Sequence, residues 1–408
     1  MHLTSLLCVC LTGMFTIMPF EVKSAELDNT VVGRDSIDYL LLDGERLQLE
    51  LWYPALPPES QSEPHKDYAF SADLKQALVE VSGMPSMTIS TKETSNGFRG
   101  VSVKPGTFPL VIFSHGSASF SRQNSRQLEA LALAGYIVVA PSHPGESLTT
   151  EYADGTIQGI YRSQPALALM GSTADKKQLA QEIEKIAHQS DQLRQQNADD
   201  YIQALPNFVA QTLFRHSAES ATRRSQHLVQ LVNQLKANDN QVKQSVLAQA
   251  DLSRIALYGH SLGGVISVLA AEMLNKEQKT IQAVINLDTV QFIPPKENSL
   301  ELSTPTCFIM GGATKMAKTI ASNLNLNRHW AEANEAVCEI NIAKAAHNNF
   351  TDLTYVTPLK WFGLLGPIKN KAFGDWLNGF IIAYFNHKLS DKTYDYPIWP
   401  GAELTGAI

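Results

Sequence analysis

One pentapeptide in this chain has the residue types and spacing of a covalent catalytic centre, namely Gly-His-Ser-Leu-Gly at residues 259–263. It matches the pattern G-x-S-x-G, in which a serine stands on a sharp turn between a buried strand and a helix. The apolar residues 255–258 before it predict that strand, and the Ala-rich residues 265–273 after it predict the helix. Glycines on both sides give the turn backbone freedom and room. Because so short a pattern also arises by chance, the interpretation of Ser261 as a nucleophile depends on these flanks and on suitable partners.

A serine hydroxyl is a weak nucleophile at neutral pH, so it needs a base within hydrogen-bond reach and an acid that orients the base. Asp288 is the acid candidate, because it ends the predicted strand 283–287 after the helix. His347 is the base candidate, because it lies in the loop after the last predicted strand, 338–342. The carboxyl ends of parallel strands share one edge of a sheet, so we expect Ser261, Asp288 and His347 to meet there.

Other histidines and carboxylates compete for these two roles. His387 follows a long predicted helix rather than a strand, and His329 lies in a polar helical stretch. Asp352 and Asp375 have no predicted strand before them. The position directly after a strand therefore favours the first pair.

Acyl transfer also needs hydrogen-bond donors for the negative oxygen that develops in the transition state. The backbone N–H of Leu262, directly after the nucleophile, is one expected donor. The loop after the predicted strand 109–114 is expected to supply the other, from Ser117 or Gly116, since a glycine there lets the backbone approach a substrate. The alternative is that His115 and Gly116 form an ordinary turn at the end of a strand.

The wider pattern indicates an α/β fold with a mostly parallel central sheet. Residues 109–114 and 136–141 are continuous apolar runs, typical of strands buried on both faces, and residues 127–133 between them have helical spacing. A strand, a helix and a strand in this order form a unit with parallel strands. Residues 35–54 alternate in polarity around an Asp-Gly pair, which predicts an N-terminal antiparallel hairpin.

Residues 173–240 interrupt this rhythm with a segment rich in Gln, Lys, Glu and Asn, interpreted as a helical insertion. Apolar residues at helical spacing predict amphipathic helices on either side of Pro206, through Leu179, Ile183 and Ile186 before it and Leu228, Leu231, Val232 and Leu235 after it. We expect the last helix to pack on the sheet and the earlier ones to cover its carboxyl edge, where lids are built. A surface helical hairpin with no role in binding is the alternative.

The composition narrows the possible partners. The chain has 408 residues, of which 44% are hydrophobic and 18% charged, an ordinary globular composition. Its net charge of −7 gives no electrostatic reason to expect nucleic acid as a partner. A metal-binding spacing such as His-Glu-x-x-His is not found, so we expect neither a metal nor another cofactor.

The amino terminus has the pattern of a secretory signal peptide. Residues 3–20 are apolar, and small residues follow at 24 and 25, which predicts a signal peptide of residues 1–25 and a mature domain of residues 26–408. An uncleaved membrane anchor is the alternative, although polar residues interrupt the run and its length is near the lower limit for a span. A secreted or periplasmic protein would be able to join Cys307 and Cys338 in a disulfide, and two buried thiols are the other possibility.

Several segments together resemble the platelet-activating factor acetylhydrolase family, of the secreted plasma type and its bacterial relatives. They are Leu-Trp-Tyr-Pro at 51–54, Phe-Ser-His-Gly at 113–116, Arg-Ile-Ala-Leu at 254–257, Gly-His-Ser-Leu-Gly-Gly at 259–264, Asn-Leu-Asp at 286–288 and Ala-His-Asn-Asn-Phe-Thr-Asp at 346–352. The resemblance covers most of the mature chain and implies an α/β-hydrolase fold. It also implies that Ser261, Asp288 and His347 are the catalytic triad. By the same resemblance, Leu262 and Ser117 supply the oxyanion hole.

Two departures from the animal enzymes concern the shape of the acyl pocket rather than catalysis, because only backbone N–H groups are needed there. Phe is common in those enzymes where this chain has Leu262, and Leu is common where it has Ser117. The insertion also looks long for the family.

We therefore expect a serine carboxyl-ester hydrolase that acts on short acyl esters or on the short sn-2 acyl group of a phospholipid. A lipase, polyester depolymerase or thioesterase with the same triad, and a catalytically inactive homologue used for binding, are the alternatives. The apolar residues 361–365, Trp-Phe-Gly-Leu-Leu, would contact a lipid surface, line the acyl site or belong to the core.

Overall fold

The computed structural model describes most of the chain after residue 28. The described residues are 29–58, 72–82, 86–88, 95–160, 198–210, 214–237, 240–243, 245–276, 278–289, 291–293, 301–313, 326–356, 364–390 and 393–408, with single residues at 177, 181, 184 and 188. Three sequence predictions fall outside these ranges. They are the signal peptide at 1–25, the helix pattern at 179, 183 and 186, and residues 361–363 of the apolar segment.

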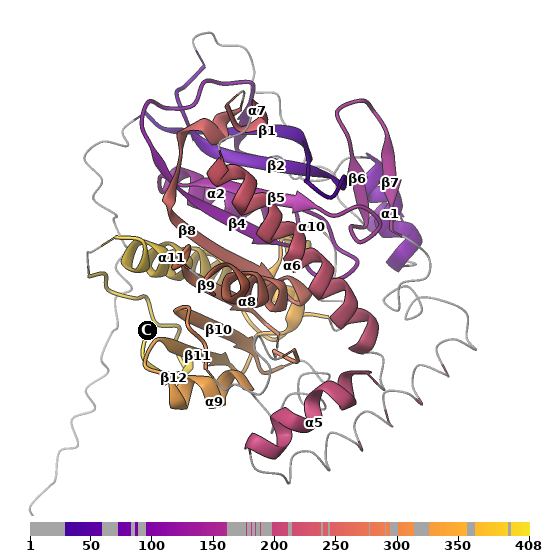
Figure 1. Ribbon diagram of the computed structural model, residues 1–408, viewed down its shortest axis with the longest axis vertical. Helices are drawn as coiled ribbons and strands as arrows, with labels where there is room; N and C mark the ends of the chain where they lie inside the picture. The colour runs from indigo at the N-terminus through magenta and orange to yellow at the C-terminus, as the bar shows by residue number, and fades with distance from the viewer. Residues whose placement is uncertain are drawn as a thin grey trace, which may run out of the picture.

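A large sheet forms the centre of the described structure, in the strand order β12-β11-β10-β9-β8-β4-β5-β2-β1-β3 (Figure 1). All neighbours from β5 through β4, β8, β9 and β10 to β11 run parallel, whereas β2 is antiparallel to β5 and β12 to β11. The mostly parallel sheet expected from the sequence is therefore confirmed. Its strands are β1 (Val31–Leu40), β2 (Arg46–Ala55), β3 (Gly97–Arg99), β4 (Phe108–Ser114), β5 (Ile137–Ser142), β8 (Ala250–His260), β9 (Ile281–Leu287), β10 (Thr306–Gly311), β11 (Val337–Ile342) and β12 (Glu403–Gly406).

Strands β1 and β2 form the predicted N-terminal hairpin. Their antiparallel register pairs Leu40 with Arg46, and the N–H of Leu41 donates to the carbonyl of Glu45 across the turn. Gly44 adopts a φ of 90° in this turn, a backbone conformation that is strained for other residues. The Asp-Gly pair recognised in the sequence therefore sets the turn.

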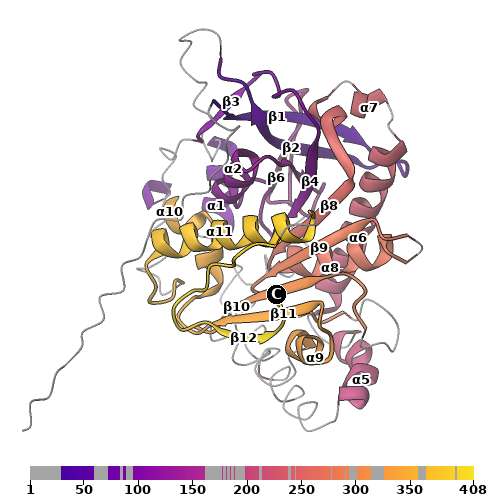
Figure 2. The ribbon, with the colours of Figure 1, turned by 90° about the vertical axis from the view of Figure 1, so that its left-hand side faces the viewer.

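Helices cover both faces of the parallel sheet, which explains why its strands are apolar at consecutive positions. Neighbouring residues of β4 alternate between two cores, with Leu110 facing one and Val111 the other. The first core lies under α6 and α8, and the second under α2 and α11 (Figure 2). The longer helices of the described ranges are α1 (Ala72–Ser82), α2 (Ser125–Leu133), α5 (Ala198–Ala210), α6 (Phe214–Ala237), α8 (Leu262–Leu274), α9 (Leu326–Ala333) and α11 (Asn370–Lys388).

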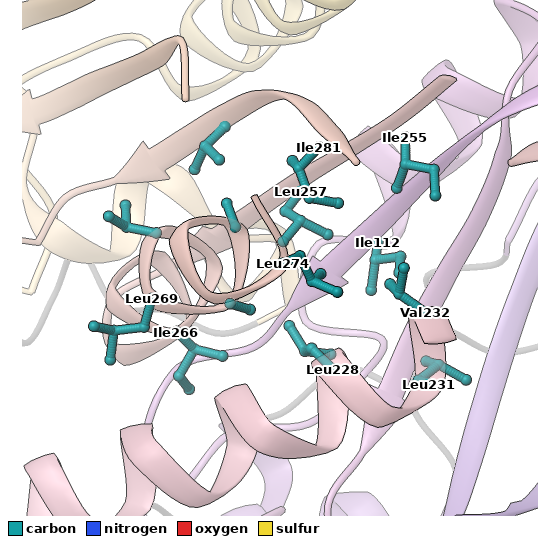
Figure 3. Close-up of a cluster of buried hydrophobic side chains, with 14 of the residues drawn as sticks. Ile112, Leu228, Leu231, Val232, Ile255, Leu257, Ile266, Leu269, Leu274 and Ile281 are labelled. Carbon is teal, nitrogen blue, oxygen red and sulfur yellow. The ribbon is translucent and has the colours of Figure 1, made fainter. Parts of the chain in front are cut away.

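Helix α6, in the polar segment 173–240, packs on the sheet as expected. Its apolar stripe is completely buried in the first core, and Figure 3 shows Leu228 pointing toward Leu274 of α8 and Val232 toward Ile112 of β4. The residues of this stripe are Leu228, Leu231, Val232 and Leu235. The periodicity of the sequence therefore identified the buried face of α6 correctly.

The expectation that Pro206 separates two helices is wrong. Pro206 lies inside α5, which continues to Ala210. A proline in a helix removes one backbone donor, but tertiary packing can compensate for the lost hydrogen bond. Leu205 and Val209, one helical turn apart, are buried in the first core and hold α5 in place through the proline.

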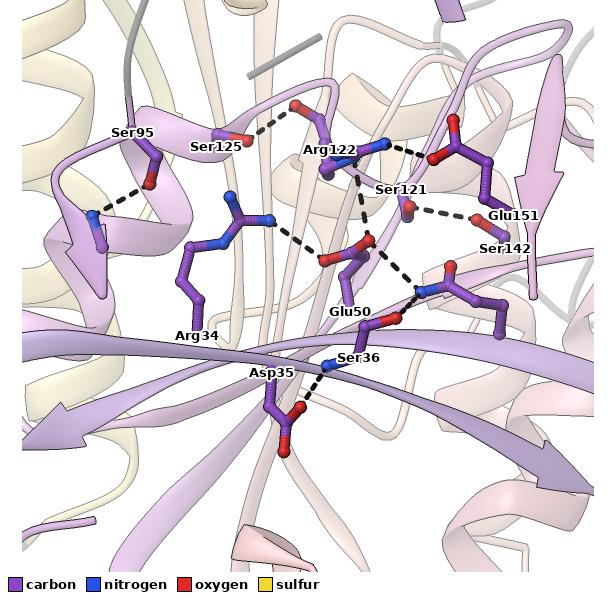
Figure 4. A network of polar contacts seen from close by, with 12 residues as sticks. Arg34, Asp35, Ser36, Glu50, Ser95, Ser121, Arg122, Ser125, Ser142 and Glu151 are labelled. Atoms are coloured by element: carbon purple, nitrogen blue, oxygen red, sulfur yellow. Dashed lines mark hydrogen bonds and ion pairs between the residues drawn. The ribbon is translucent and has the colours of Figure 1, made fainter. Parts of the chain in front are cut away.

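A buried polar network joins the hairpin to the loop that follows β4 (Figure 4). Arg34 of β1 donates to one oxygen of Glu50 of β2 at 3.0 Å, and Arg122 of the loop lies 3.7 Å from the other oxygen. Arg122 also lies 3.5 Å from Glu151 of β6 (Thr149–Glu151). Two guanidinium groups around Glu50 offset the cost of burying its charge. The network therefore anchors the loop between β4 and α2 to the sheet.

Cys307 and Cys338 occupy paired positions of the neighbouring parallel strands β10 and β11 and form a disulfide. Both residues are buried in the second core. Of the two alternatives left open by the sequence, the structure therefore contains the disulfide. The bridge lies near the first residues of both strands, at the end opposite to the candidate site.

Candidate active site

Ser261 stands on the turn between β8, which ends at His260, and α8, which begins at Leu262. Its backbone has φ 57° and ψ −130°, a combination that L-residues rarely adopt. The turn is held on both sides, because the N–H of Ser261 donates to the Leu287 carbonyl and its carbonyl accepts from the N–H of Gly264. The strand, turn and helix expected around this serine are confirmed.

The glycines beside the serine are required by steric contact. A Cβ on Gly263 would lie 1.9 Å from the carbonyl oxygen of Ser114, and a Cβ on Gly259 would lie 2.2 Å from the carbonyl oxygen of Gly263. Strand β4 and helix α8 therefore touch backbone to backbone at the turn. This close approach brings the loop after β4 next to the serine, where a Cβ on Gly116 would lie 3.2 Å from the Cβ of Ser261.

Asp288 and His347 meet at the same edge of the sheet. Asp288 follows the last residue of β9, and His347 begins the short helix η4 (His347–Phe350) after β11. Oδ2 of Asp288 accepts a hydrogen bond from Nδ1 of His347 at 2.6 Å, and its Oδ1 accepts the N–H of Gly311 at 2.6 Å. A carboxylate at Nδ1 holds the proton on that nitrogen and leaves Nε2 available as a base.

Asp288 is much more buried than His347, as expected for an orienting acid and a base that must reach a substrate. The side chain of Asp288 is 3% exposed, whereas that of His347 is 33% exposed. A buried carboxylate keeps its interaction with the imidazole free of water, and a half-exposed imidazole can reach a substrate.

One backbone hydrogen bond and one ring contact bring the serine turn to the Asp288–His347 pair. The N–H of Ser261 donates to Leu287, the residue before Asp288, at 2.9 Å. The ring of His260, the residue before the serine, lies 4.4 Å from the ring of His347 between centroids. The three residues selected from the sequence therefore come from three different strand ends and gather at one place.

The competing carboxylates and histidines have other partners. Asp352 accepts the backbone N–H of Arg126 near the start of α2, at 2.8 Å, and Asp375 pairs with Lys371 on the surface of α11. His387, near the end of α11, contacts the hydroxyl of Tyr396. These contacts give each of the three residues a structural partner outside the Asp288–His347 pair.

The expected oxyanion donors differ in their availability. Leu262 is the first residue of α8, where a helix leaves its N–H groups without intrahelical partners and carries a partial positive charge. The N–H of Gly116 already donates to Oε1 of Gln123 at 3.1 Å, while Ser117 is exposed at the same loop. Ala118, next in the loop, has a φ of 49°. This arrangement favours Ser117 over Gly116 as the second donor.

Arg224 of α6 binds the end of β4 and the start of the loop that follows it. The sequence analysis did not identify this residue. Its guanidinium is completely buried and donates to the His115 carbonyl at 2.6 Å and to the hydroxyl of Ser114 at 3.3 Å. Burial, with a smaller effect of Arg223, lowers the pKa of Arg224 to about 9. No local sequence signal marks this arginine, since its partners lie more than 100 positions away.

Two further sequence expectations concern metals and membranes. Within the part of the chain that the structure describes, no three His, Cys, Asp or Glu side chains gather in a way that would hold a metal ion. None of the helices in the described ranges combines the length and hydropathy needed to span a bilayer. Of the apolar segment 361–365, Leu364 is 46% exposed and Leu365 is partly buried.

Comparison with known proteins agrees with this architecture. Residues 45–400 match the model of the family described as platelet-activating factor acetylhydrolase, isoform II. A platelet-activating factor acetylhydrolase of Gallus gallus is 28% identical over 308 residues, which cover 72% of this chain and 65% of that protein. The protein of the same name from Cavia porcellus is 24% identical over 363 residues, 85% of this chain and 74% of its own. The chain thus spans about two thirds to three quarters of the length of these relatives.

A solved structure shows the same fold at lower identity. The ferulic acid esterase from Streptomyces cinnamoneus superposes with a TM-score of 0.60 over 94% of this chain and 98% of its own, at 17% identity. Together with the strand order and the two helical layers, this likeness establishes the α/β-hydrolase fold.

Proposed function

Because this chain belongs to the platelet-activating factor acetylhydrolase, isoform II family, we propose that it is a serine carboxyl-ester hydrolase with Ser261, Asp288 and His347 as its triad. The observation that carries the proposal is the 2.6 Å hydrogen bond between Asp288 and His347, located beside a serine on a strained turn between strand and helix. A carboxylate at Nδ1 and a partly exposed ring with Nε2 available are the two features that a general base requires.

The proposed reaction follows from these positions. The Ser261 hydroxyl attacks the ester carbonyl carbon while Nε2 of His347 takes its proton, and Asp288 stabilises the resulting imidazolium. The N–H groups of Leu262 and Ser117 stabilise the negative oxygen of the tetrahedral intermediate. His347 then returns the proton to the leaving alcohol, and an acyl-serine remains. Water, deprotonated by the same imidazole, releases the carboxylic acid and restores the serine.

The substrate class is inferred from the family. The two relatives compared above are named acetylhydrolases of a platelet-activating factor, so we propose short acyl esters, including a short sn-2 acyl group of a phospholipid. A series of p-nitrophenyl esters from acetate to palmitate, together with phospholipids that carry a short or a long sn-2 chain, tests this choice. Preference for long chains would instead favour a lipase.

The catalytic assignment is tested by one substitution. Ser261→Ala is expected to lower the kcat for p-nitrophenyl acetate by about 10⁴-fold or more, since the nucleophile is lost. Circular dichroism and the melting temperature are expected to stay close to wild type. A fluorophosphonate probe is expected to label the wild type and not the variant. Activity that survives the substitution would refute the assignment.

We also propose that residues 1–25 are removed on export and that the mature enzyme is secreted or periplasmic. The disulfide between Cys307 and Cys338 supports an oxidising compartment. Mass spectrometry of the exported protein is expected to find an amino terminus near residue 26. An intact amino terminus in the membrane fraction would favour an anchor.

A further inference from the structure

Three linked hydrogen bonds connect residues 115–124, the loop between β4 and α2 that we call the oxyanion loop, to the base His347. They pass through two side chains that the proposed reaction does not use. The N–H of Gly116 donates to Oε1 of Gln123 at 3.1 Å. Nε2 of Gln123 lies 2.6 Å from Nδ1 of His260, and Nε2 of His260 lies 3.0 Å from the carbonyl oxygen of His347. Gln123 and His260 are 2% and 3% exposed, so water does not compete for these bonds.

Both ends of this chain are backbone groups with fixed roles, which decides the direction of every bond. A backbone N–H can only donate, so the oxygen of the Gln123 amide must face Gly116 and its nitrogen must face His260. Nδ1 of His260 then accepts, and the proton of the imidazole lies on Nε2. That proton points at the carbonyl of His347, which can only accept.

His260 must be neutral for the chain to form, and its surroundings keep it neutral. A second proton on Nδ1 would oppose the N–H of Gln123. Burial, with a smaller effect of His347, lowers the pKa of His260 well below its ordinary value. The ring is also packed in place, 4.4 Å from the ring of His347 and 6.5 Å from that of Phe350 between centroids.

We infer that Gln123 and His260 are positioning residues that hold the oxyanion loop and His347 in register with Ser261, an inference that rests on the proposed function. Because His260 precedes Ser261 directly in the sequence, its hydrogen bonds position the oxyanion loop and His347 relative to the nucleophile. The link to Gly116 occupies that N–H and leaves Ser117 as the loop donor. The link to His347 fixes the backbone from which the base projects. A displacement of about 1 Å in such a site costs on the order of 100-fold in rate.

Two substitutions remove the linked hydrogen bonds while keeping the approximate volume of the side chains. Gln123→Leu removes both amide bonds, and His260→Phe keeps an aromatic ring without nitrogen atoms. Each is expected to lower the kcat for p-nitrophenyl acetate by about 10- to 100-fold with KM changed less than about threefold, because geometry rather than binding is disturbed. His260→Gln, whose amide can still donate to the His347 carbonyl, is expected to recover part of the loss.

Gln234→Leu is the matched control. Gln234 is also a buried glutamine that bridges a backbone N–H and a carbonyl, those of Leu42 and Leu40, but it does so at the hairpin turn. This variant is expected to lose stability and to keep the kcat of the wild type. An equal loss of kcat in the control would show that buried glutamines matter here only for folding.

The double variant Gln123→Leu/His260→Phe tests whether the two residues act through the same linked hydrogen bonds or have independent effects on kcat. Residues that act through one chain are non-additive, so the double variant is expected to lose no more than about threefold beyond the worse single variant. Losses that multiply, or single variants with the kcat of the wild type, would overturn the inference.

Failure of the esterase proposal is recognised separately. If the wild type hydrolyses no ester faster than Ser261→Ala, that proposal fails, and the ¹⁵N spectrum of histidine-labelled protein still tests the chain. The expected signal, assigned by its absence from His260→Phe, is a neutral imidazole protonated at Nε2. Protonation at Nδ1, or a charged ring at neutral pH, would contradict the directions derived above.

Discussion

Backbone strain marks the candidate site at the scale of single residues. Among the described residues, the non-glycine positions with positive φ are Ala118, Ser261 and Asp288, at 49°, 57° and 56°. Each belongs to a different part of the proposed machinery, namely the oxyanion loop, the nucleophile and the acid. Such conformations each cost about 1–3 kcal/mol and persist where the surrounding structure imposes them.

The strain at Ser261 predicts a difference between two inactive variants. Ser261→Ala keeps a Cβ at φ 57°, whereas Ser261→Gly removes it. The glycine is expected to relieve more strain than it adds in unfolded-chain entropy, so its free energy of unfolding should exceed that of the alanine variant by about 1 kcal/mol. Urea denaturation of both variants measures this difference. A less stable glycine variant would show that the turn is not strained.

The hydrogen bond of Asp288 predicts a second effect. Asp288→Asn offers the imidazole an amide that can turn its N–H toward Nδ1, which stabilises the wrong tautomer, so kcat is expected to fall by about 10³- to 10⁴-fold with little change in KM. Steady-state kinetics with p-nitrophenyl acetate measures the loss. Asp251→Asn, near the start of β8, is the control and should keep full kcat. A nearly active Asp288→Asn would argue against the triad.

Residues with a local signal were identified from the sequence, and residues defined by distant contacts were not. Ser261 lies in a motif, and Asp288 and His347 follow apolar runs, so their positions at strand ends could be predicted from the sequence. Gln123 and Arg224 lie in unremarkable sequence, and their partners are brought to them only by the fold. His260 occupies a variable position of the motif, so its hydrogen bond to His347, in the loop after β11, could not be inferred from the motif.

At the scale of elements, buried strands and amphipathic helices were predictable because each has its own periodicity. The strands β4, β5, β8, β9 and β11 all coincide with apolar runs, and their ends differ from those of the runs by at most five residues. Pro206 was misjudged because the packing of Leu205 and Val209 outweighs a local helix-breaking preference. Helix α6 was located by its stripe, but Arg224 on the same helix shows that it also supports the site.

The contact between β4 and α8 predicts opposite results for the same substitution in two helices. Gly263→Ala would place a Cβ 1.9 Å from the Ser114 carbonyl oxygen and is expected to lower the free energy of unfolding by about 3 kcal/mol or more. Gly379→Ala in α11 meets only Pro397, at 3.7 Å, and is expected to gain about 0.5–1 kcal/mol from helix propensity. Thermal melts of both variants test the pair. Equal stabilities would contradict the close approach.

At the scale of the whole molecule, the disulfide and the candidate site occupy opposite ends of the parallel strands. Cys307 lies near the start of β10, and Gly311, whose N–H holds Asp288, ends the same strand. Gly311 lies four positions after Cys307, which is about 13 Å along the strand at the usual rise per residue. The signal peptide expected at residues 1–25 and the disulfide point to the same compartment, although only the disulfide lies within the described structure.

This separation predicts that the disulfide can be removed without loss of catalysis. The bridge closes a loop with a sequence separation of 31, for which chain entropy alone gives about 3–4 kcal/mol. Cys307→Ala/Cys338→Ala is therefore expected to lower the free energy of unfolding by about 3 kcal/mol, while kcat at 25 °C stays at the wild-type value. Urea denaturation and steady-state kinetics on the same preparation measure both quantities. The single variant Cys307→Ala should be as unstable as the double one, because either change opens the loop. A kcat that falls with the bridge, in protein that is still folded, would mean that β10 transmits its constraint to Asp288.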